Sequence, residues 1–595
     1  MHTIEDVYDV LDTATFACKT ESDMKRSNAN VDGDTSMGAM LTYGSEVARM
    51  WVDDKLLLPV VKDCIDANLI YIHDKDFYGL TETCCQIRLD ELFKGGFHTG
   101  HGYVREPNSI TTAAALTCIA IQSNQNEMHG GQAIPAFDWY LAPYVERSYN
   151  KHYHDVLKVA SELKDSVDPD CEKWRELAWE RTVEETYQAM EALIHNLNTM
   201  HSRAGAQVPF SSINYATCTS KEGRLIIECV LKATEKGLGH GETPIFPVQI
   251  FKVKEGVNYN EGDPNYDLFQ LAMQVSAKRL FPNFSFLDSP FNAQYLKGDD
   301  PNYEVAYMGC RTRVMSNVDK EHEQTGGRGN LSFTSVNLPG IALSCDGDSD
   351  VFIERLGTVM DVVKLQLEHR LAIQKSRRVY NYPFLMGNGV WLGSDELEWN
   401  DEVGDILNHG TLTIGFIGLA EAMVALFGKH HGESDDVWDF AYNTIKFMRE
   451  RCDAYTESSG LNFSLIATPA EGLSGKFVPK DRERYGEIEG ITDKSYYTNS
   501  FHIPVYYNIT IAEKIEREAP FHELCNGGHI TYIELDGDVS ANPQAFEAVI
   551  RYMHDCGVGY GAINHPVDRD PVCGYTGIIG DTCPCCGRKE FEPIS

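Results

Sequence analysis

Apolar side chains recur at helical spacing between Thr35 and Leu69, which predicts one or two packed helices. The run that follows, LIYIHDKDFY at 69–78, is short and strand-like. Between Ser109 and Gln122 the run SITTAAALTCIAIQ is dense in small residues, which allow a helix to approach another backbone closely. This segment therefore predicts a helix that packs either in the core or at a subunit interface.

The connections between these segments are acidic and rich in turn formers. Such stretches lie near residues 163–172, 254–267 and 343–350, and they predict surface loops. No repeat or low-complexity tract separates them. With 595 residues and 43% hydrophobic content, the chain can bury a large core, either as several domains or as one large α/β barrel.

The charge of the chain and its cysteine content indicate which partners and which cellular compartment to expect. The chain carries 52 basic and 88 acidic residues, a net charge of -36, with no basic stripe, so neither a nucleic-acid polymer nor an anionic membrane is expected as a partner. Small ligands are compatible with this charge. Seventeen cysteines, without a signal peptide or a long apolar run, indicate a reducing cytoplasm in which thiols serve as ligands, nucleophiles or radical carriers.

The C-terminal run CPCCG has the spacing of a metal knuckle. Cys583 and Cys586 form a C-x-x-C pair that can place two thiolates on one tetrahedral metal ion. Turn formers flank the pair and no βαβ pattern surrounds it, so we expect a structural zinc ribbon rather than a redox motif. The candidate ligands are Cys573, Cys583, Cys586 and His565, with Asp570, Cys556 and Cys585 as open alternatives for the fourth position.

Three glycine-flanked motifs in the interior contain cysteine or polar residues, at 81–110, 306–317 and 326–340. A single cysteine in such a motif is usually an ordinary buried thiol. Cys310, however, lies between a glycine and an arginine in MGCRT, which indicates an irregular loop tip. A loop tip is a suitable place for a reactive sulfur.

Several separate runs together carry a family resemblance. They are IYIHDKDFY, GFHTGHGYVREPNSI, IQSNQNEMHGGQAIPAFDWYLAP, MGCRTRV, HGTLTIGFIGLAE, LIATPAEGLSGKF and CPCCG. In these runs, and almost from end to end, the chain resembles the anaerobic, class III ribonucleoside-triphosphate reductases. It is most similar to the shorter members without an N-terminal ATP cone, so control of overall activity by that cone is not expected.

The resemblance implies a ten-stranded α/β barrel of two parallel five-stranded halves in residues 1–555, followed by a zinc-ribbon-like segment in 556–595. A finger loop through the barrel would carry Cys310, the cysteine that becomes a thiyl radical and abstracts the ribose 3′ hydrogen. Cys84 would be the second active-site cysteine, which delivers a proton and hydrogen to the 2′ position, with Cys85 as its adjacent rival. The site must then exclude water and oxygen.

The resemblance also implies the binding residues and the reductant. Asn330 in GRGN resembles the asparagine of members that take electrons from formate, although a turn asparagine beside glycines is the plain alternative. The triphosphate of the substrate is expected at Ser109 and the TPAEG loop, through Thr468, Glu471 and Gly472. A dNTP or ATP effector is expected at a dimer interface, where the candidate residues are Gln125, His129 and Gln132; their alternative role is hydrogen bonding across that interface.

The position of the radical glycine departs from the family pattern. Family members continue past the ribbon into a loop whose glycine stores the radical, whereas this sequence ends at KEFEPIS. Gly574 in VCGYTG partly resembles that motif, but it precedes CPCCG and aligns better with the first half of the ribbon. We therefore expect the radical to come from a missing tail or from a separate glycyl-radical subunit, generated by a radical-SAM activase.

The sequence thus predicts a cytoplasmic, oxygen-sensitive homodimer that reduces ribonucleoside triphosphates and so supplies dNTPs for DNA replication. Two alternatives are another glycyl-radical enzyme and a catalytically silent, nucleotide-binding regulatory homologue.

Overall fold

The computed structural model describes residues 2–16, 35–163, 168, 171–203, 207–309, 311–535, 537–565, 568–570, 572–573, 575–577, 579 and 581–589. Cys310 and Gly574, two residues singled out by the sequence, lie outside this described set. Within it, no helix is long and apolar enough to cross a membrane.

The N-terminal region is helical, as its apolar spacing predicts. Its elements are α1 (Ile4–Phe16), α2 (Ser36–Trp51), the π-helix η1 (Val52–Leu56) and α3 (Pro59–Asp66). Thr35 caps the N-terminus of α2: its hydroxyl accepts the N–H of Gly38 at 3.1 Å and so satisfies one free donor of the first turn. The strand expected in 69–78 is β1 (Ile70–Ile72).

A seven-stranded sheet forms one side of the molecule, in the order β14-β15-β8-β7-β6-β5-β2. Its strands are β2 (Cys85–Gln86), β5 (Gln132–Ile134), β6 (Ser211–Tyr215), β7 (Val248–Val253), β8 (Asn283–Phe286), β14 (Thr531–Glu534) and β15 (Tyr560–Asn564). The five strands from β2 to β8 are parallel, whereas β15 joins β8 in the antiparallel sense. Every residue of β5, β6, β7 and β8 is buried, as is usual for parallel strands covered on both faces.

A four-stranded sheet forms the other side, in the order β1-β11-β12-β13. Strands β11 (Asn330–Asn337), β12 (Thr411–Ile417) and β13 (Asn462–Ala467) are parallel, and β1 runs antiparallel at the edge. The expected α/β class is therefore confirmed. Among the described residues, however, the strands form two main sheets and three two-stranded ones, and not one closed ten-stranded barrel.

Helices follow most of the strands and cover both sheets. In the first half they are α4 (Leu89–Leu92), α5 (Ile110–Gln125), α6 (Phe137–Leu163), α7 (Glu172–Thr199), α8 (Lys221–Lys236), α9 (Tyr266–Arg279) and α10 (Pro290–Ala293). In the second half they are α11 (Leu338–Leu343), α12 (Ser349–Lys375), α13 (Leu419–Phe427), α14 (Asp435–Ser459), α15 (Val478–Tyr485), α16 (Ile511–Leu524) and α17 (Pro543–Asp555). One hydrophobic core extends through both sheets and the helices around them.

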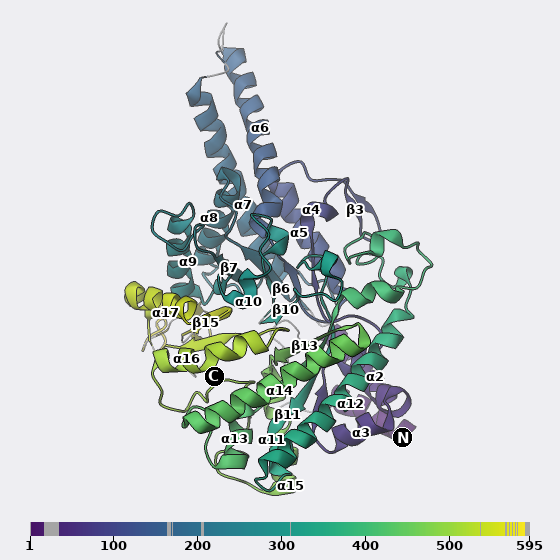
Figure 1. Ribbon diagram of the computed structural model, residues 1–595. Coiled ribbons are helices and arrows are strands. Elements are labelled where there is room, and N and C mark those ends of the chain that lie inside the picture. The colour runs from purple at the N-terminus through teal and green to yellow at the C-terminus, as the bar shows by residue number, and fades with distance from the viewer. Residues whose placement is uncertain are drawn as a thin grey trace.

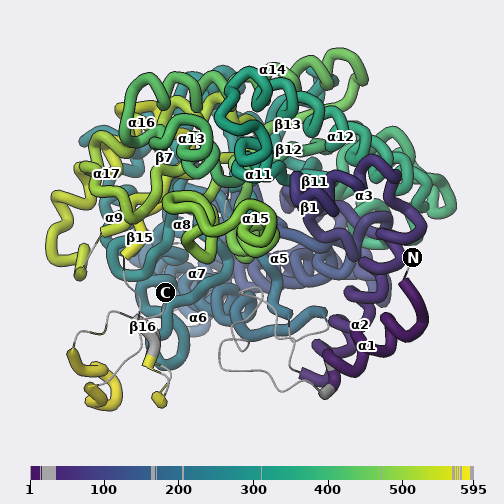
Figure 2. Tube along the Cα trace, turned by 90° about the horizontal axis from the view of Figure 1, so that it is seen from below, coloured from purple at the N-terminus to yellow at the C-terminus, as the bar shows by residue number. Residues whose placement is uncertain are grey.

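Helices α6 and α7 pair and project from the body of the molecule (Figure 1). The small-residue run predicted as a helix is α5, which packs on both of them. In the view from below, the N-terminal helices α1 and α2 lie on the opposite side of the molecule from the C-terminal segment that contains β16 (Asp568–Arg569) (Figure 2). The remaining short strands are β3 (Phe97–His98), β4 (Tyr103–Val104) and β17 (Thr576–Gly577).

A short antiparallel hairpin, β9 (Tyr307–Met308) and β10 (Thr312–Arg313), corresponds to the MGCRT motif. We call residues 307–313 the finger hairpin. Tyr307, Met308, Arg311 and Arg313 are all buried, so the hairpin runs through the interior and not over the surface. The described residues on both sides of position 310 therefore lie in the interior.

Candidate functional site

The first strand of the finger hairpin is bonded to β6 of the seven-stranded sheet. The Asn214 side chain accepts the N–H of Tyr307 at 2.9 Å and donates to the Tyr307 carbonyl at 2.9 Å. Ser212 Oγ accepts the N–H of Gly309 at 2.8 Å. Gly309 has a φ of +55°, a conformation that glycine adopts without strain, and it directly precedes the position of the candidate radical cysteine.

The second strand of the hairpin is bonded to segments beside the four-stranded sheet. Arg313 donates its backbone N–H to the Gly527 carbonyl at 2.9 Å. Arg311 Nη1 donates to the carbonyls of Ala467 and Thr468, at 3.3 and 3.2 Å, where β13 ends. The hairpin is thus held by both sides of the molecule.

Cys84 faces the finger hairpin. Its side chain packs in a small buried cluster with Ala133, Met308 and Val314, and its Sγ accepts the N–H of Asn330 at 3.3 Å. Burial raises the pKa of the Cys84 thiol to about 12, because the thiolate would lose its hydration. The thiol is therefore protonated at neutral pH and has a hydrogen to give.

Cys85 faces the other way. It pairs in register with Gln132 on β5 and belongs to the main hydrophobic core. Burial also raises the pKa of its thiol well above the usual value. Alternation of side chains along the chain therefore separates the two adjacent cysteines, and Cys84 is the one that lies in the cluster with Met308 of the hairpin.

Asn330 begins β11 directly beside Cys84. Its Nδ2 donates to Thr411 Oγ1 at 3.1 Å and to Thr413 Oγ1. Its Oδ1 is buried and has no hydrogen-bond partner in the described part of the chain. A buried carbonyl oxygen without a donor costs about 1–3 kcal/mol, which is a common cost at a site that binds a polar ligand.

The carboxyl ends of β11, β12 and β13 carry a second group of polar side chains. Thr468 Oγ1 lies 2.8 Å from Ser335 Oγ, which in turn lies 2.8 Å from His73 Nε2. Lys476 Nζ donates to the hydroxyl of Tyr71 at 2.9 Å and adds a positive charge nearby. Burial holds the pKa of His73 well below its usual range, so this ring is neutral.

The residues expected to bind the triphosphate are only partly brought together. Glu471 and Gly472 begin the short helix η8 (Glu471–Gly475) directly after this group, and the side chain of Glu471 lies outside the described set. Ser109 lies elsewhere, as the N-cap of α5, where its Oγ accepts the N–H of Thr112 at 3.2 Å. There it caps the N-terminus of the helix, and a serine before an apolar helical run is a common signal for such a cap.

A surface cavity of about 880 Å³ lies beside the C-terminal end of α5. None of the three expected effector residues lines it: Gln125 Nε2 donates to the Val208 carbonyl at 3.1 Å, His129 stacks on Phe77, and Gln132 is buried in β5. Its lining includes His98, Thr99, His101, Gln122, Asn126 and Ser202. Gln122 and Asn126 are one helical turn apart, a spacing that could have identified this polar face from the sequence.

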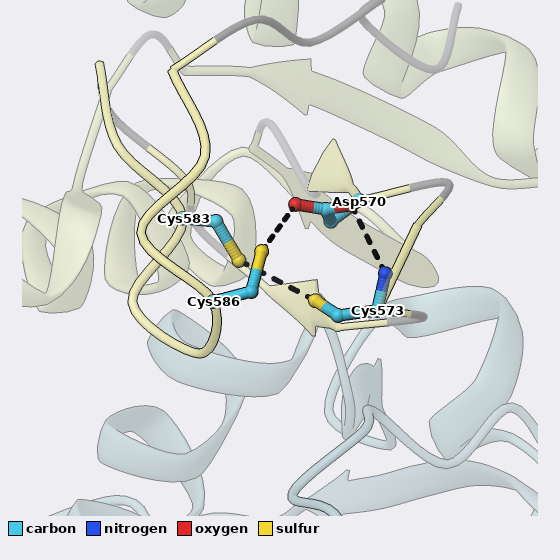
Figure 3. Close-up of side chains that lie close together, drawn as sticks. All are labelled: Asp570, Cys573, Cys583 and Cys586. Atoms are coloured by element: carbon cyan, nitrogen blue, oxygen red, sulfur yellow. Dashed lines mark hydrogen bonds between the residues drawn. The ribbon is translucent and has the colours of Figure 1, made fainter.

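Four side chains of the C-terminal segment gather around one point (Figure 3): Asp570, Cys573, Cys583 and Cys586. One ligand atom from each lies within 4.8 Å of the others. Cys573 Sγ is 3.6 Å from Cys583 Sγ, and Cys586 Sγ is 3.1 Å from Asp570 Oδ2. Three sulfur atoms and one carboxylate oxygen in this arrangement suit a tetrahedral zinc ion.

Asp570, one of the open alternatives, occupies the fourth position of this group. Its Oδ1 accepts the N–H groups of Val572 and Cys573, at 2.8 and 3.2 Å, which orients the other oxygen toward the thiols. His565 stands apart, with its Nε2 3.3 Å from the Ser276 carbonyl. The segment D-x-x-C at 570–573 thus mirrors C-x-x-C at 583–586.

Anaerobic ribonucleotide reductases are among the solved structures with a similar fold. One structure of that description has a TM-score of 0.71 at 17% identity and covers 99% of this chain and 87% of its own. The enzyme of Thermotoga maritima, with dATP bound in the specificity site, has a TM-score of 0.70 at 18% identity, over 98% of this chain and 92% of its own. The fold is therefore that of an anaerobic ribonucleotide reductase.

Sequence comparison shows to which protein family the chain belongs. The family model "Anaerobic ribonucleoside-triphosphate reductase" matches residues 27–595. The reductase of that name from Escherichia coli K12 is 33% identical over 97% of this chain and 80% of its own length, and that of Enterobacteria phage T4 is 31% identical over 97% and 93%. The chain belongs to the anaerobic ribonucleoside-triphosphate reductase family and is an oxidoreductase that acts on ribonucleoside triphosphates.

Proposed function

We propose that the chain performs this reduction by radical chemistry between the finger hairpin and Cys84. The observation that carries the proposal is the buried contact of Cys84 with Met308 of the hairpin, two residues before Cys310. In this proposal Cys310 forms the thiyl radical and abstracts the 3′ hydrogen, and Cys84 supplies hydrogen to the 2′ side. The catalytically silent alternative is not favoured by the family assignment.

The two sheets are proposed to be parts of one ten-stranded barrel. Strands β2, β5, β6, β7 and β8 would form one parallel half, and β11, β12, β13, β14 and β15 the other. Two backbone hydrogen bonds support this. The N–H of Gly327, shortly before β11, donates to the carbonyl of Gln86 on β2 at 2.8 Å, and the N–H of Ala467, at the end of β13, donates to the carbonyl of Gly528, shortly before β14, at 2.9 Å. A barrel of this kind would surround the finger hairpin and keep water from the radical.

Formate is the proposed reductant, with Asn330 as the residue that serves it. The balance is then one ribonucleoside triphosphate, one formate and one proton giving one deoxyribonucleoside triphosphate, carbon dioxide and water. Formate supplies two electrons and the 2′ hydroxyl leaves as the water. Asn330 supports this role because its backbone N–H donates to Cys84 Sγ and its side-chain Oδ1 has no hydrogen-bond partner within the described chain.

The test is anaerobic turnover with radiolabelled formate and a ribonucleoside triphosphate, after activation by a radical-SAM activase. We expect labelled carbon dioxide in equal amount to the dNTP formed, and Asn330→Ala to lower that release by about 10²-fold, as loss of a polar group at a reacting centre does. Turnover that requires thioredoxin and ignores formate would contradict the role of Asn330. Absence of any dNTP with either reductant would contradict the function itself.

Nucleotide sites are proposed at two places. The substrate triphosphate is assigned to the carboxyl ends of β11, β12 and β13, where Thr468 and Gly472 offer polar groups and Lys476 and Arg311 offer charge. Ligands commonly bind at such strand ends. A dNTP or ATP effector is assigned to the cavity beside α5, with Gln122 and Asn126 among its ligands.

The proposed assembly follows the resemblance. It comprises a homodimer and a radical-SAM activase that generates a glycyl radical.

We further propose that Asp570, Cys573, Cys583 and Cys586 hold one structural zinc ion in a ribbon-like segment that follows β15. Metal analysis of the purified chain should give about one zinc per chain. Cys583→Ser and Asp570→Ala should lower zinc retention during dialysis against a chelator, because each removes one of four ligands. Cys585→Ser is the matched control, since the exposed Cys585 is outside the group. Zinc loss in the control but not in Cys583→Ser would overturn the assignment.

A further inference from the structure

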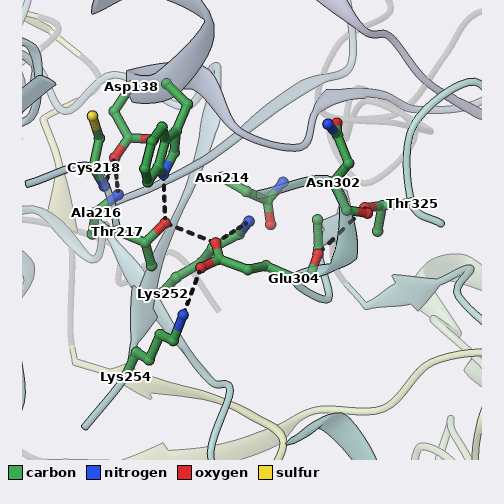
Figure 4. A network of polar contacts seen from close by, with 12 residues as sticks. Asp138, Asn214, Ala216, Thr217, Cys218, Lys252, Lys254, Asn302, Glu304 and Thr325 are labelled. Carbon is green, nitrogen blue, oxygen red and sulfur yellow. Dashed lines mark hydrogen bonds and ion pairs between the residues drawn. The ribbon is translucent and has the colours of Figure 1, made fainter. Parts of the chain in front are cut away.

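A buried charged network lies at the base of the finger hairpin (Figure 4). Glu304, which is 1% exposed, precedes Tyr307 by three residues. Its carboxylate accepts the hydroxyl of Thr217 at 2.7 Å and lies 3.3 Å from the ammonium groups of both Lys252 and Lys254. The two lysines are on β7 and directly after it, so the carboxylate connects the approach to the hairpin with the seven-stranded sheet.

Stability alone does not explain this network. Lys252 is fully buried, and a buried ion pair is commonly no more stable than a packed apolar pair of the same volume, because both charges lose their hydration. Its effect is geometric, since one carboxylate is held at three points by groups from β7 and from the segments that directly follow β6 and β7. Such an arrangement specifies the position of the backbone that carries it.

Thr217 is itself held in place. Trp139 Nε1 donates to its hydroxyl at 3.0 Å. The preceding residue, Ala216, has a φ of +106°, a strained conformation for a residue with a side chain. Asp138 accepts the N–H groups of Ala216 and Cys218, both at 2.9 Å, and so maintains that strained turn.

The finger hairpin needs external support, because each of its strands has only two residues and so short a hairpin is not stable alone. Ser212 and Asn214 bond the hairpin to β6, and Glu304 is the charged contact at its entry. We propose that Glu304, through Lys252, Lys254 and Thr217, is a positioning residue that fixes the finger hairpin relative to Cys84. The expected effect on catalysis rests on the radical function proposed above, whereas the expected effect on the position of the hairpin does not.

The experiment compares three variants. Glu304→Gln removes the charge that pairs with the lysines. The double variant Lys252→Met/Glu304→Leu removes the fully buried ion pair and leaves an apolar pair in its place. Glu235→Gln is the matched control, because Glu235 pairs with Lys278 at 3.1 Å on the exposed surface. For each, kcat and KM of anaerobic turnover, the melting temperature, and hydrogen exchange at the amides of Tyr307 and Gly309 are measured.

We expect Glu304→Gln to lower kcat by about 100-fold with little change in KM, as a displacement of about 1 Å in a reacting group does. Exchange at Tyr307 and Gly309 should accelerate by about tenfold or more, as local opening becomes easier. The double variant should melt at a higher temperature than Glu304→Gln, because only the partly exposed Lys254 keeps a charge without its partner. It should still show the low kcat and the fast exchange, since the contact with Glu304 is lost. The control should match the wild type throughout.

Other outcomes overturn the proposal. Recovery of kcat and slow exchange in the double variant would show that Glu304 only balances charge. A folded Glu304→Gln variant with wild-type exchange at Tyr307 and Gly309 would show that it does not position the hairpin. If the wild type itself gives no turnover, the radical function fails, and the exchange measurement alone decides whether Glu304 fixes the hairpin.

Discussion

Cys84→Ala should lower anaerobic dNTP formation by at least about 10²–10⁴-fold, the usual contribution of a positioned proton donor. The reason is the position of the Cys84 side chain, which packs against Met308 of the finger hairpin and whose sulfur accepts a hydrogen bond from the N–H of Asn330. The raised pKa of this thiol keeps its hydrogen at neutral pH. The measurement is dNTP formed per activated chain, with nucleotide binding followed separately to show that the substrate site is intact.

Cys85→Ala is the matched variant, since it removes the same atoms one residue along the chain. Cys85 lies in the main core and not in the cluster that Cys84 forms with Met308, so we expect a small loss of stability, about 1 kcal/mol from the cavity left behind, and continued turnover. An inactive Cys85→Ala beside an active Cys84→Ala would reverse the assignment of the two cysteines. Equal loss in both would mean that the local strand, and not one thiol, is what the reaction needs.

Local signals were sufficient for the features that depend on neighbours in the sequence. The spacing of apolar residues from Thr35 predicted α2 and α3, because a helix face is defined by residues three and four apart. The C-x-x-C spacing predicted that Cys583 and Cys586 would converge. The adjacent pair Cys84 and Cys85 could be named as candidates, but their separation depends on which face of β2 meets the hairpin.

Features that depend on distant contacts were not accessible from the sequence. Asp570, and not His565, lies beside the three cysteines because of how the turn at 570–573 folds against 583–586. Gln125 was expected to bind an effector, yet it is turned toward Val208, because the loop after α7 approaches that side of α5. Ser109 was grouped with Thr468 by its chemistry, although the fold uses it to cap α5. Each of these outcomes is set by tertiary packing, which overrides local pattern.

The importance of the close approach between β2 and the start of β11 can be tested by adding one methyl group. A Cβ on Gly329 would lie 1.7 Å from the Cys84 carbonyl oxygen and 2.9 Å from the Cys85 Cα. These are backbone atoms, which cannot turn aside as a flexible side chain can.

Gly329→Ala should therefore push Cys84 away from Asn330. We expect a loss of about 1–3 kcal/mol or more in the free energy of unfolding, as overpacking gives, and a fall in kcat of about 10²-fold from the displaced thiol. Chemical denaturation and anaerobic turnover measure the two effects. Gly44→Ala in α2 is the control, because nothing lies within 4 Å of the added methyl group and alanine is the better helix former, so it should be at least as stable as the wild type. Wild-type stability and turnover in Gly329→Ala would mean that β2 and β11 do not approach as closely as described, and the pairing of Cys84 with Asn330 would lose its basis.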